Sequence, residues 1–163
     1  MRYYISTPFC AICENREETA GMIADVMITE SDAAATAYSV FCAGNEFYHE
    51  EDDAGFEEWA TYEAYDLLDR AEKNGRSAAY GVTVYANAKA AALEERASDA
   101  FDPWCGPDAR VALFCAIYNG GEELDWLLEQ LHDLAHEVDP EEAEKILALI
   151  ADISRFDGER RPA

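Results

Sequence analysis

The segment EELDWLLEQLHDLAHEV, residues 122–138, has the clearest structural pattern in the sequence. Its apolar side chains recur at the i, i+3, i+4 and i+7 spacing that places residues on one face of an α-helix. They are Leu124, Leu127, Leu128, Leu131, Leu134, Ala135 and Val138. This pattern predicts an amphipathic helix that packs its leucines into the core, and we expect the rest of the fold to be organised around it.

The opposite face of this predicted helix is acidic. It carries Glu122, Asp125, Glu129, Asp133 and Glu137, and the segment contains no Lys or Arg. Because successive residues of a helix are about 100° apart, Trp126 points away from the leucines and into the acidic face. An acidic face built around an exposed Trp indicates a recognition surface for a partner.

Residues 56–73 predict a second amphipathic helix with the same arrangement. Its buried side is expected to consist of Phe56, Ala60, Ala64, Leu67 and Ala71. Its outer side carries Glu58, Asp69 and Glu72, with Tyr65 among them. From residue 46 to residue 72 there are eleven acidic residues and one base, Arg70. We therefore expect a second acidic face on this helix, preceded by an acidic loop around His49.

The fold class predicted from the whole chain is α+β and mostly helical. Turn and capping signals predict a small β element near the N-terminus (2–6) and around 78–86, and further helices over 14–26, 32–43, 87–100, 109–119 and 141–156. Ser31, Asp108 and Asp139 are the expected N-caps of three of these helices. The core is expected to be the 109–119 helix, flanked by an antiparallel hairpin of the last two helices and by the 56–73 helix. We expect one domain over residues 1–157 and a flexible tail over 158–163.

The charge balance limits the classes of function. The chain has 35 acidic and 12 basic residues, a formal net charge of −23. Such a surface repels nucleic acids and membranes and attracts basic surfaces, many of which bind nucleic acids. The first residues, MRYYISTPFC, contain no apolar segment of the kind found in secretory signals, so we expect none, and no apolar run is long enough to span a membrane. We therefore expect a cytoplasmic protein that contacts neither membranes nor nucleic acids directly, with its five Cys reduced.

Two explanations of the acidity remain open. Low Lys content and abundant Ala fit a protein from a high-salt organism, in which acidic surfaces are general, whereas five Cys fit that origin less well. Alternatively, the acidity is the function, and the surface imitates a polyanion.

Motifs that carry chemistry are weak in this chain. Cys10 and Cys13 form a C-x-x-C pair between a predicted strand and helix, which is the local context of a redox site, but buried thiols are the favoured interpretation. His132 and His136 lie four residues apart on the acidic helix and are weak candidates for metal ligands, because no third ligand follows at a suitable spacing. Residues 104–108, WCGPD, match a thioredoxin-like sequence without its second Cys. We expect no enzyme activity and no cofactor.

In size, acidity and lack of catalytic motifs, the chain resembles the DNA-mimic anti-defence proteins of phages and plasmids, namely antirestriction proteins and acidic anti-CRISPR inhibitors. The resemblance is one of composition and extends over the whole chain. It implies a stoichiometric inhibitor, acting in the host cytoplasm if phage-encoded, that blocks the DNA- or RNA-binding groove of a bacterial defence complex. The alternatives are an acidic adaptor or dimerisation module, which could form a homodimer through its exposed aromatics, and the halophile protein described above.

Overall fold

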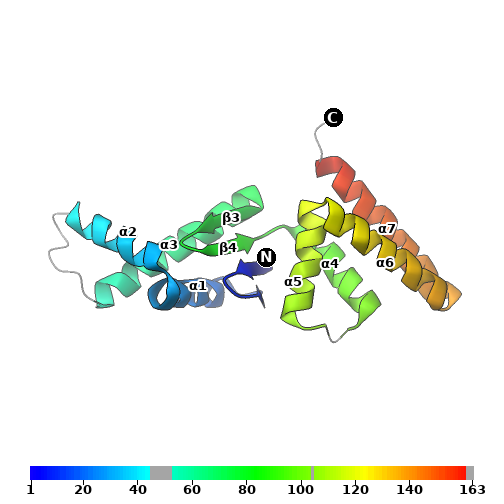
Figure 1. Ribbon diagram of the computed structural model, residues 1–163, viewed down its shortest axis with the longest axis horizontal. Helices are drawn as coiled ribbons and strands as arrows, with labels where there is room; N and C mark the ends of the chain where they lie inside the picture. The colour runs from blue at the N-terminus through cyan, green and yellow to red at the C-terminus, as the bar shows by residue number, and fades with distance from the viewer. Residues whose placement is uncertain (45–52, 104, 161–163) are drawn as a thin grey trace. The chain divides into compact units, whose positions relative to one another are not determined.

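The computed structural model of the chain describes residues 1–44, 53–103 and 105–160. Within these residues there are seven helices and a small four-stranded antiparallel sheet, which confirms the α+β, mostly helical fold class (Figure 1). The predicted acidic loop around His49, and Trp104, lie outside the described residues. The chain divides into two compact units, Met1–Asn87 and Ala88–Ala163, and each is described by itself. That 1–157 behaves as one domain stays a prediction.

The sheet belongs to the first unit. It consists of β1 (Tyr3–Thr7), β2 (Ala11–Cys13), β3 (Arg76–Ala79) and β4 (Val82–Tyr85). Its strand order is β2-β1-β4-β3, and every neighbouring pair is antiparallel. The N-terminal strand therefore lies in the interior of the sheet and pairs with a strand about 80 residues later in the chain.

The β element predicted around residues 78–86 is confirmed, and the structure shows that it is a hairpin of two strands. β3 and β4 are joined by Tyr80 and Gly81, which have positive φ angles of 54° and 79°. Two consecutive positive φ angles are typical of the tight two-residue turns whose twist matches that of a hairpin. Gly81 adopts this conformation without strain, whereas Tyr80 is a residue type that rarely marks such a turn in a sequence.

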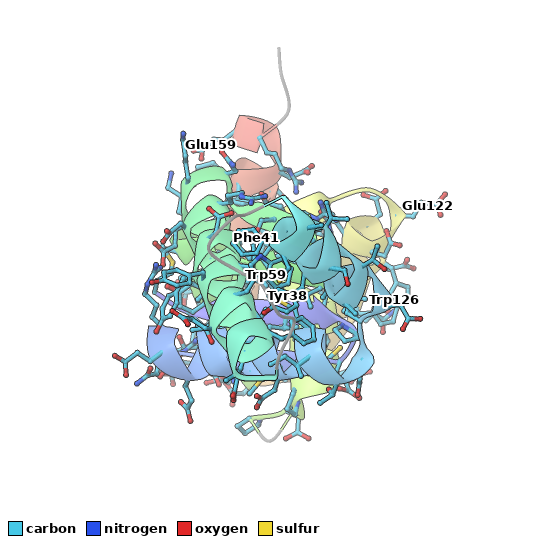
Figure 2. All side chains as sticks on the ribbon, turned by 90° about the vertical axis from the view of Figure 1, so that its left-hand side faces the viewer. Tyr38, Phe41, Trp59, Glu122, Trp126 and Glu159 are labelled. Carbon is cyan, nitrogen blue, oxygen red and sulfur yellow. The ribbon has the colours of Figure 1, made fainter. Side chains whose placement is uncertain are left out.

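Three helices complete the first unit: α1 (Arg16–Glu30), α2 (Asp32–Ala43) and α3 (Asp53–Asn74). α2 has the predicted bounds, and the Ser31 hydroxyl caps it by accepting a hydrogen bond from the Ala34 N–H at 3.0 Å. α3 packs against α1 and the sheet. Tyr38 from α2 lies beside Trp59 from α3, with ring centroids 5.6 Å apart (Figure 2).

The predicted buried side of α3 is largely confirmed. Ala60, Ala64, Leu67 and Ala71 are buried, and Phe56 is half-buried against the same core. α3 belongs to the first unit, so the predicted core between this helix and the 109–119 helix is wrong. The apolar face of α3 is instead covered by α1 and the sheet, whose Tyr3, Ile5 and Val84 are buried with it.

The second unit contains four helices: α4 (Ala88–Phe101), α5 (Pro107–Asn119), α6 (Glu122–Glu137) and α7 (Pro140–Arg160). α6 and α7 form the predicted antiparallel hairpin (Figure 1). Asp139 caps α7 as predicted, since its carboxylate accepts a hydrogen bond from the Glu142 N–H at 3.0 Å. The N-cap predicted at Asp108 is wrong: α5 begins at Pro107 after Gly106, because Pro is well suited to the first helical position.

A buried ion pair joins α4 to α5. The Glu94 side chain is 0% exposed, and Arg110 donates to its two carboxylate oxygens at 2.6 and 2.9 Å. A bidentate contact of this kind compensates for part of the cost of removing the carboxylate from water. Arg110 therefore fixes how α4 and α5 meet.

Residues 158–160 of the predicted flexible tail over 158–163 belong to α7, which continues to Arg160. Arg160 forms an ion pair with Asp157 and donates to the Ile117 carbonyl at 3.1 Å. These contacts extend the helix and attach its end to the last turn of α5. Gly120 and Gly121, which follow α5, have φ angles of 73° and 77°. A Cβ atom on Gly120 would lie 2.5 Å from the Arg160 guanidinium, so a side chain at this position would displace that group.

Arg110→Ala is expected to destabilise the second unit by about 3 kcal/mol, because the buried Glu94 carboxylate loses its guanidinium partner. The measurement is the free energy of unfolding in urea, followed by hydrogen exchange on peptides of α4 and α5. The control is Arg155→Ala, which removes an ion pair to Asp152 whose Arg side chain is 69% exposed and should cost less than about 1 kcal/mol. Equal losses in the two variants would contradict the structural role of Arg110.

Candidate functional site

The two faces of α6 are arranged as the sequence predicts. Leu124, Leu127, Leu131 and Ala135 are buried, and the other apolar residues of the stripe, Leu128, Leu134 and Val138, are half-buried. Trp126 is 60% exposed and lies on the outside of the helix with Glu122 (Figure 2). The amphipathic helix and the outward orientation of its Trp are therefore confirmed.

The acidic face of α6 carries a row of carboxylates without cationic partners. Glu122, Asp125, Glu129, Asp133 and Glu137 are all exposed. Among the described residues, none of them forms an ion pair, whereas ten ion pairs involve other acidic side chains. We call these five residues the acidic row.

Four carboxylates of the acidic row repel one another along α6, whereas Glu122 and Asp125 are favoured by the helix dipole because they lie in the first turn. Asp125, Glu129, Asp133 and Glu137 follow one another at i, i+4 spacing, so each lies about 6 Å along the axis from the next. Like charges at this spacing destabilise a helix by a few tenths of a kcal/mol per pair, or about 1 kcal/mol for three pairs. The last two carboxylates also lie near the helix C-terminus, where the helix dipole disfavours negative charge. The row thus has an unfavourable charge arrangement that a cationic partner would relieve.

The acids predicted on α3 have a different environment. Arg16 of α1 forms ion pairs with both Asp69 and Glu72, the latter at 2.7 Å. Its guanidinium lies over the Tyr65 ring, 5.4 Å from the centroid, and Tyr3 donates a hydrogen bond to Glu72. The hydrogen bond to Asp69 is the main cause that raises the pKa of Arg16 above its usual value. Three of the four partner-binding residues predicted on α3 therefore hold α1, α3 and β1 together.

Glu58, the fourth residue predicted on α3, is exposed. It lies eleven positions before Asp69, about three helical turns away, and so outside the network around Arg16. α3 and α6 belong to different units. The acidic row of α6 is the one that the fold leaves available.

The thiol and imidazole candidates do not assemble into a site within the described residues. None of the five Cys, all of which the structure describes, forms a disulfide, and Cys13 is buried at the end of β2, where burial raises the pKa of its thiol. A helix does not follow Cys10 directly, as a redox pair of this type would need, because β2 begins at Ala11. His132 and His136 are exposed, and the described part of the chain contains no group of three or more His, Cys, Asp or Glu able to hold a metal ion.

An apolar groove beside Trp126 is the feature that sequence reasoning missed. It has a volume of about 560 Å³ and lies between α5 and α6, at the end of α4. Its lining consists of Phe101, Cys105, Ala109, Ala112, Leu113, Ala116, Glu122, Glu123, Trp126 and Leu127. The signal in the sequence is the i, i+3, i+7 spacing of the three alanines, which gives α5 a face of small side chains. Trp126 thus borders both the groove and the acidic row.

Comparisons with family models, curated protein sequences and solved structures give no match. None of the helices in the described residues has the length and hydropathy needed to span a membrane.

Asp133→Lys is expected to raise the free energy of unfolding of the second unit by about 1 kcal/mol at low salt, because two repulsive i, i+4 pairs become attractive. The matched variant, Asp69→Lys, should have the opposite sign, since it removes an ion pair and places a second cation beside Arg16. Urea titrations at low and high salt, with hydrogen exchange to separate the units, would measure both effects. If both substitutions changed the free energy of unfolding in the same direction, the environments assigned to Asp133 and Asp69 would be contradicted.

Alkaline pH should destabilise the first unit through Tyr3. Burial, and then its hydrogen bond to Glu72, raise the pKa of Tyr3 above its usual value of 10.0. A raised pKa contributes stability that is complete below the unfolded-state pKa and is lost as pH rises above it. The urea midpoint of the first unit should therefore fall more steeply above about pH 10 in the wild type than in Tyr3→Phe. The control is Tyr62→Phe, at an exposed position, which should keep the wild-type dependence of the urea midpoint on pH. The same dependence in Tyr3→Phe would contradict the role assigned to Tyr3.

Proposed function

We propose that this chain is a stoichiometric protein inhibitor that offers α6 to the basic, nucleic-acid-binding groove of another protein. The observation that carries the proposal is the acidic row, which has five exposed carboxylates and no cationic partner among the described residues. In the same chain the exposed carboxylates of Asp69 and Glu72 are paired with Arg16, whereas those of the acidic row are not. Lys and Arg side chains of a groove would supply the missing partners.

The dimensions of the row indicate what it can imitate. From Glu122 to Glu137 it extends about 22 Å, roughly the length of six base pairs of duplex DNA. Its carboxylates follow at about 6 Å, whereas duplex DNA has one charge per about 1.7 Å of axis. The row therefore competes for the few Lys and Arg residues that grip a short stretch of backbone.

Trp126 adds a contact that nucleic-acid phosphates cannot make. It is 60% exposed and lies on the acidic face between Glu122 and Asp133. Trp is over-represented among the residues that dominate protein interfaces, because its large apolar surface is removed from water on binding. Charge would thus guide α6 to a basic groove, and Trp126 would strengthen the complex.

The proposed targets are bacterial defence complexes, either restriction enzymes or CRISPR effectors, as the compositional resemblance implies. The experiment begins with affinity capture of the tagged chain from a bacterial lysate containing these complexes, with elution in salt steps. The captured complex is then purified and loaded with fluorescent duplex DNA or guide RNA. Adding the chain in equimolar amount should displace the nucleic acid at low salt and less so at high salt, since charged contacts are screened.

Glu129→Lys/Asp133→Lys should abolish this displacement while the protein stays folded, because the new cations repel the basic groove. The matched control is Asp25→Lys/Glu30→Lys, which makes the same change in net charge at two exposed positions of α1. Displacement by the control and not by the α6 variant would support the proposal. Displacement by both would show that α6 is not the binding surface. No captured complex, together with unfolding at low salt, would favour the high-salt origin instead.

A further inference from the structure

The groove between α5 and α6 exposes several apolar side chains next to one another. α5 lines it with Ala109, Ala112, Leu113 and Ala116, of which the first two are exposed. Phe101, 36% exposed, and Trp126, 60% exposed, rise at its edges. Contiguous exposed apolar surface of this kind marks interaction sites more often than isolated exposed side chains do.

The shape of the groove favours a helix as its occupant. Two helices form its walls, and strand edges are absent from its described lining, so it offers no unpaired backbone groups to an added strand. α5 has 13 residues and is therefore about 20 Å long, enough for about three to four turns of a docked helix. A volume of about 560 Å³ accommodates a few apolar side chains.

The charges around the groove select a basic occupant. The ionic side chains in its described lining are Glu122 and Glu123, and α6 contains no Lys or Arg. A second copy of the chain is disfavoured, since each copy has a net charge of −23. A segment with Lys and Arg beside its apolar side chains would instead be attracted by both glutamates and by the acidic row.

We propose that this groove binds an amphipathic, basic helix of the partner protein, with apolar side chains at i, i+3 or i+4 and i+7 seated on the α5 alanines and against Trp126. Lys and Arg on the flank of that helix would face Glu122, Glu123 and the acidic row. The inference rests on the proposed function, since one helix, α6, supplies both surfaces, but it adds an apolar requirement that charge imitation does not have.

The test uses the full chain and three synthetic peptides of about 16 residues, long enough for four helical turns. The first has leucines at helical spacing and lysines elsewhere. The second replaces its leucines by serine, and the third replaces its lysines by glutamate. Fluorescence anisotropy gives the affinity of each labelled peptide. The leucine–lysine peptide should bind at least about tenfold more tightly than either of the other two.

A pair of matched variants locates the binding site. Ala112→Phe fills the groove from an exposed position of α5 and should weaken binding of the leucine–lysine peptide about tenfold or more. Ala151→Phe makes the same change at an exposed position of α7 and should leave binding unchanged. Cys105, which lines the groove, should be alkylated more slowly when the peptide is bound, whereas Cys10 in the first unit should react at the same rate.

The outcomes separate this inference from the proposed function. Equal affinity for the serine peptide, or no effect of Ala112→Phe, would overturn the groove and leave charge imitation intact. If Ala112→Phe loses binding and Glu129→Lys/Asp133→Lys keeps it, the result would support the groove and contradict the role of the acidic row. Preferred binding of the glutamate peptide, or a dimer of the chain broken by Ala112→Phe, would overturn the choice of a basic partner.

Discussion

The scarcity of cations is the constraint on which the rest of the structure depends. With 12 Lys and Arg for 35 acidic residues, most carboxylates cannot be paired, so the positions of the few bases decide which segments are held together. Arg16 joins α1 to α3, Arg96 joins α4 to α7 through Asp152 at 2.7 Å, and Arg110 joins α4 to α5. The first two of these pairs connect segments more than 50 residues apart in sequence. α6 takes part in none of the ion pairs found in the described chain, and its attachment to the unit is apolar.

This distribution of bases separates the acidic row, which has no cationic partner among the described residues, from the acids of α3 that Arg16 holds. A helix held by its leucines can keep an unfavourable row of charges, because the burial of several large apolar side chains, at about 1.5–3 kcal/mol each, exceeds the repulsion of about 1 kcal/mol. The surface charge of α6 can therefore vary without loss of the fold. A change of charge at Asp69 or Glu72 of α3 would instead remove ion pairs that stabilise the first unit.

The sequence predicted those features that depend on local periodicity. The stripe from Leu124 to Ala135 defined α6 and the exposure of Trp126, and Ser31 and Asp139 marked helix starts correctly. It could not predict pairing at a distance: Arg16 lies 53 residues from Asp69, and helical spacing on α3 does not reveal that contact. The groove was missed for a related reason, since it depends on how the alanine face of α5 meets α6. The assignment of α3 to a common core with α5 failed because an apolar stripe does not specify which element covers it.

The contact of Arg160 with the turn between α5 and α6 has a consequence for the order in which the protein is made. The guanidinium that contacts the Ile117 carbonyl and lies beside Gly120 belongs to Arg160, about forty positions later in the chain. During synthesis α5 and α6 leave the ribosome well before Arg160 does. The junction from which Trp126 and the acidic row project thus reaches its final geometry only after residue 160 has been made and has left the ribosome. A chain terminated before residue 160 would carry the whole row on a helix whose first turn lacks this contact.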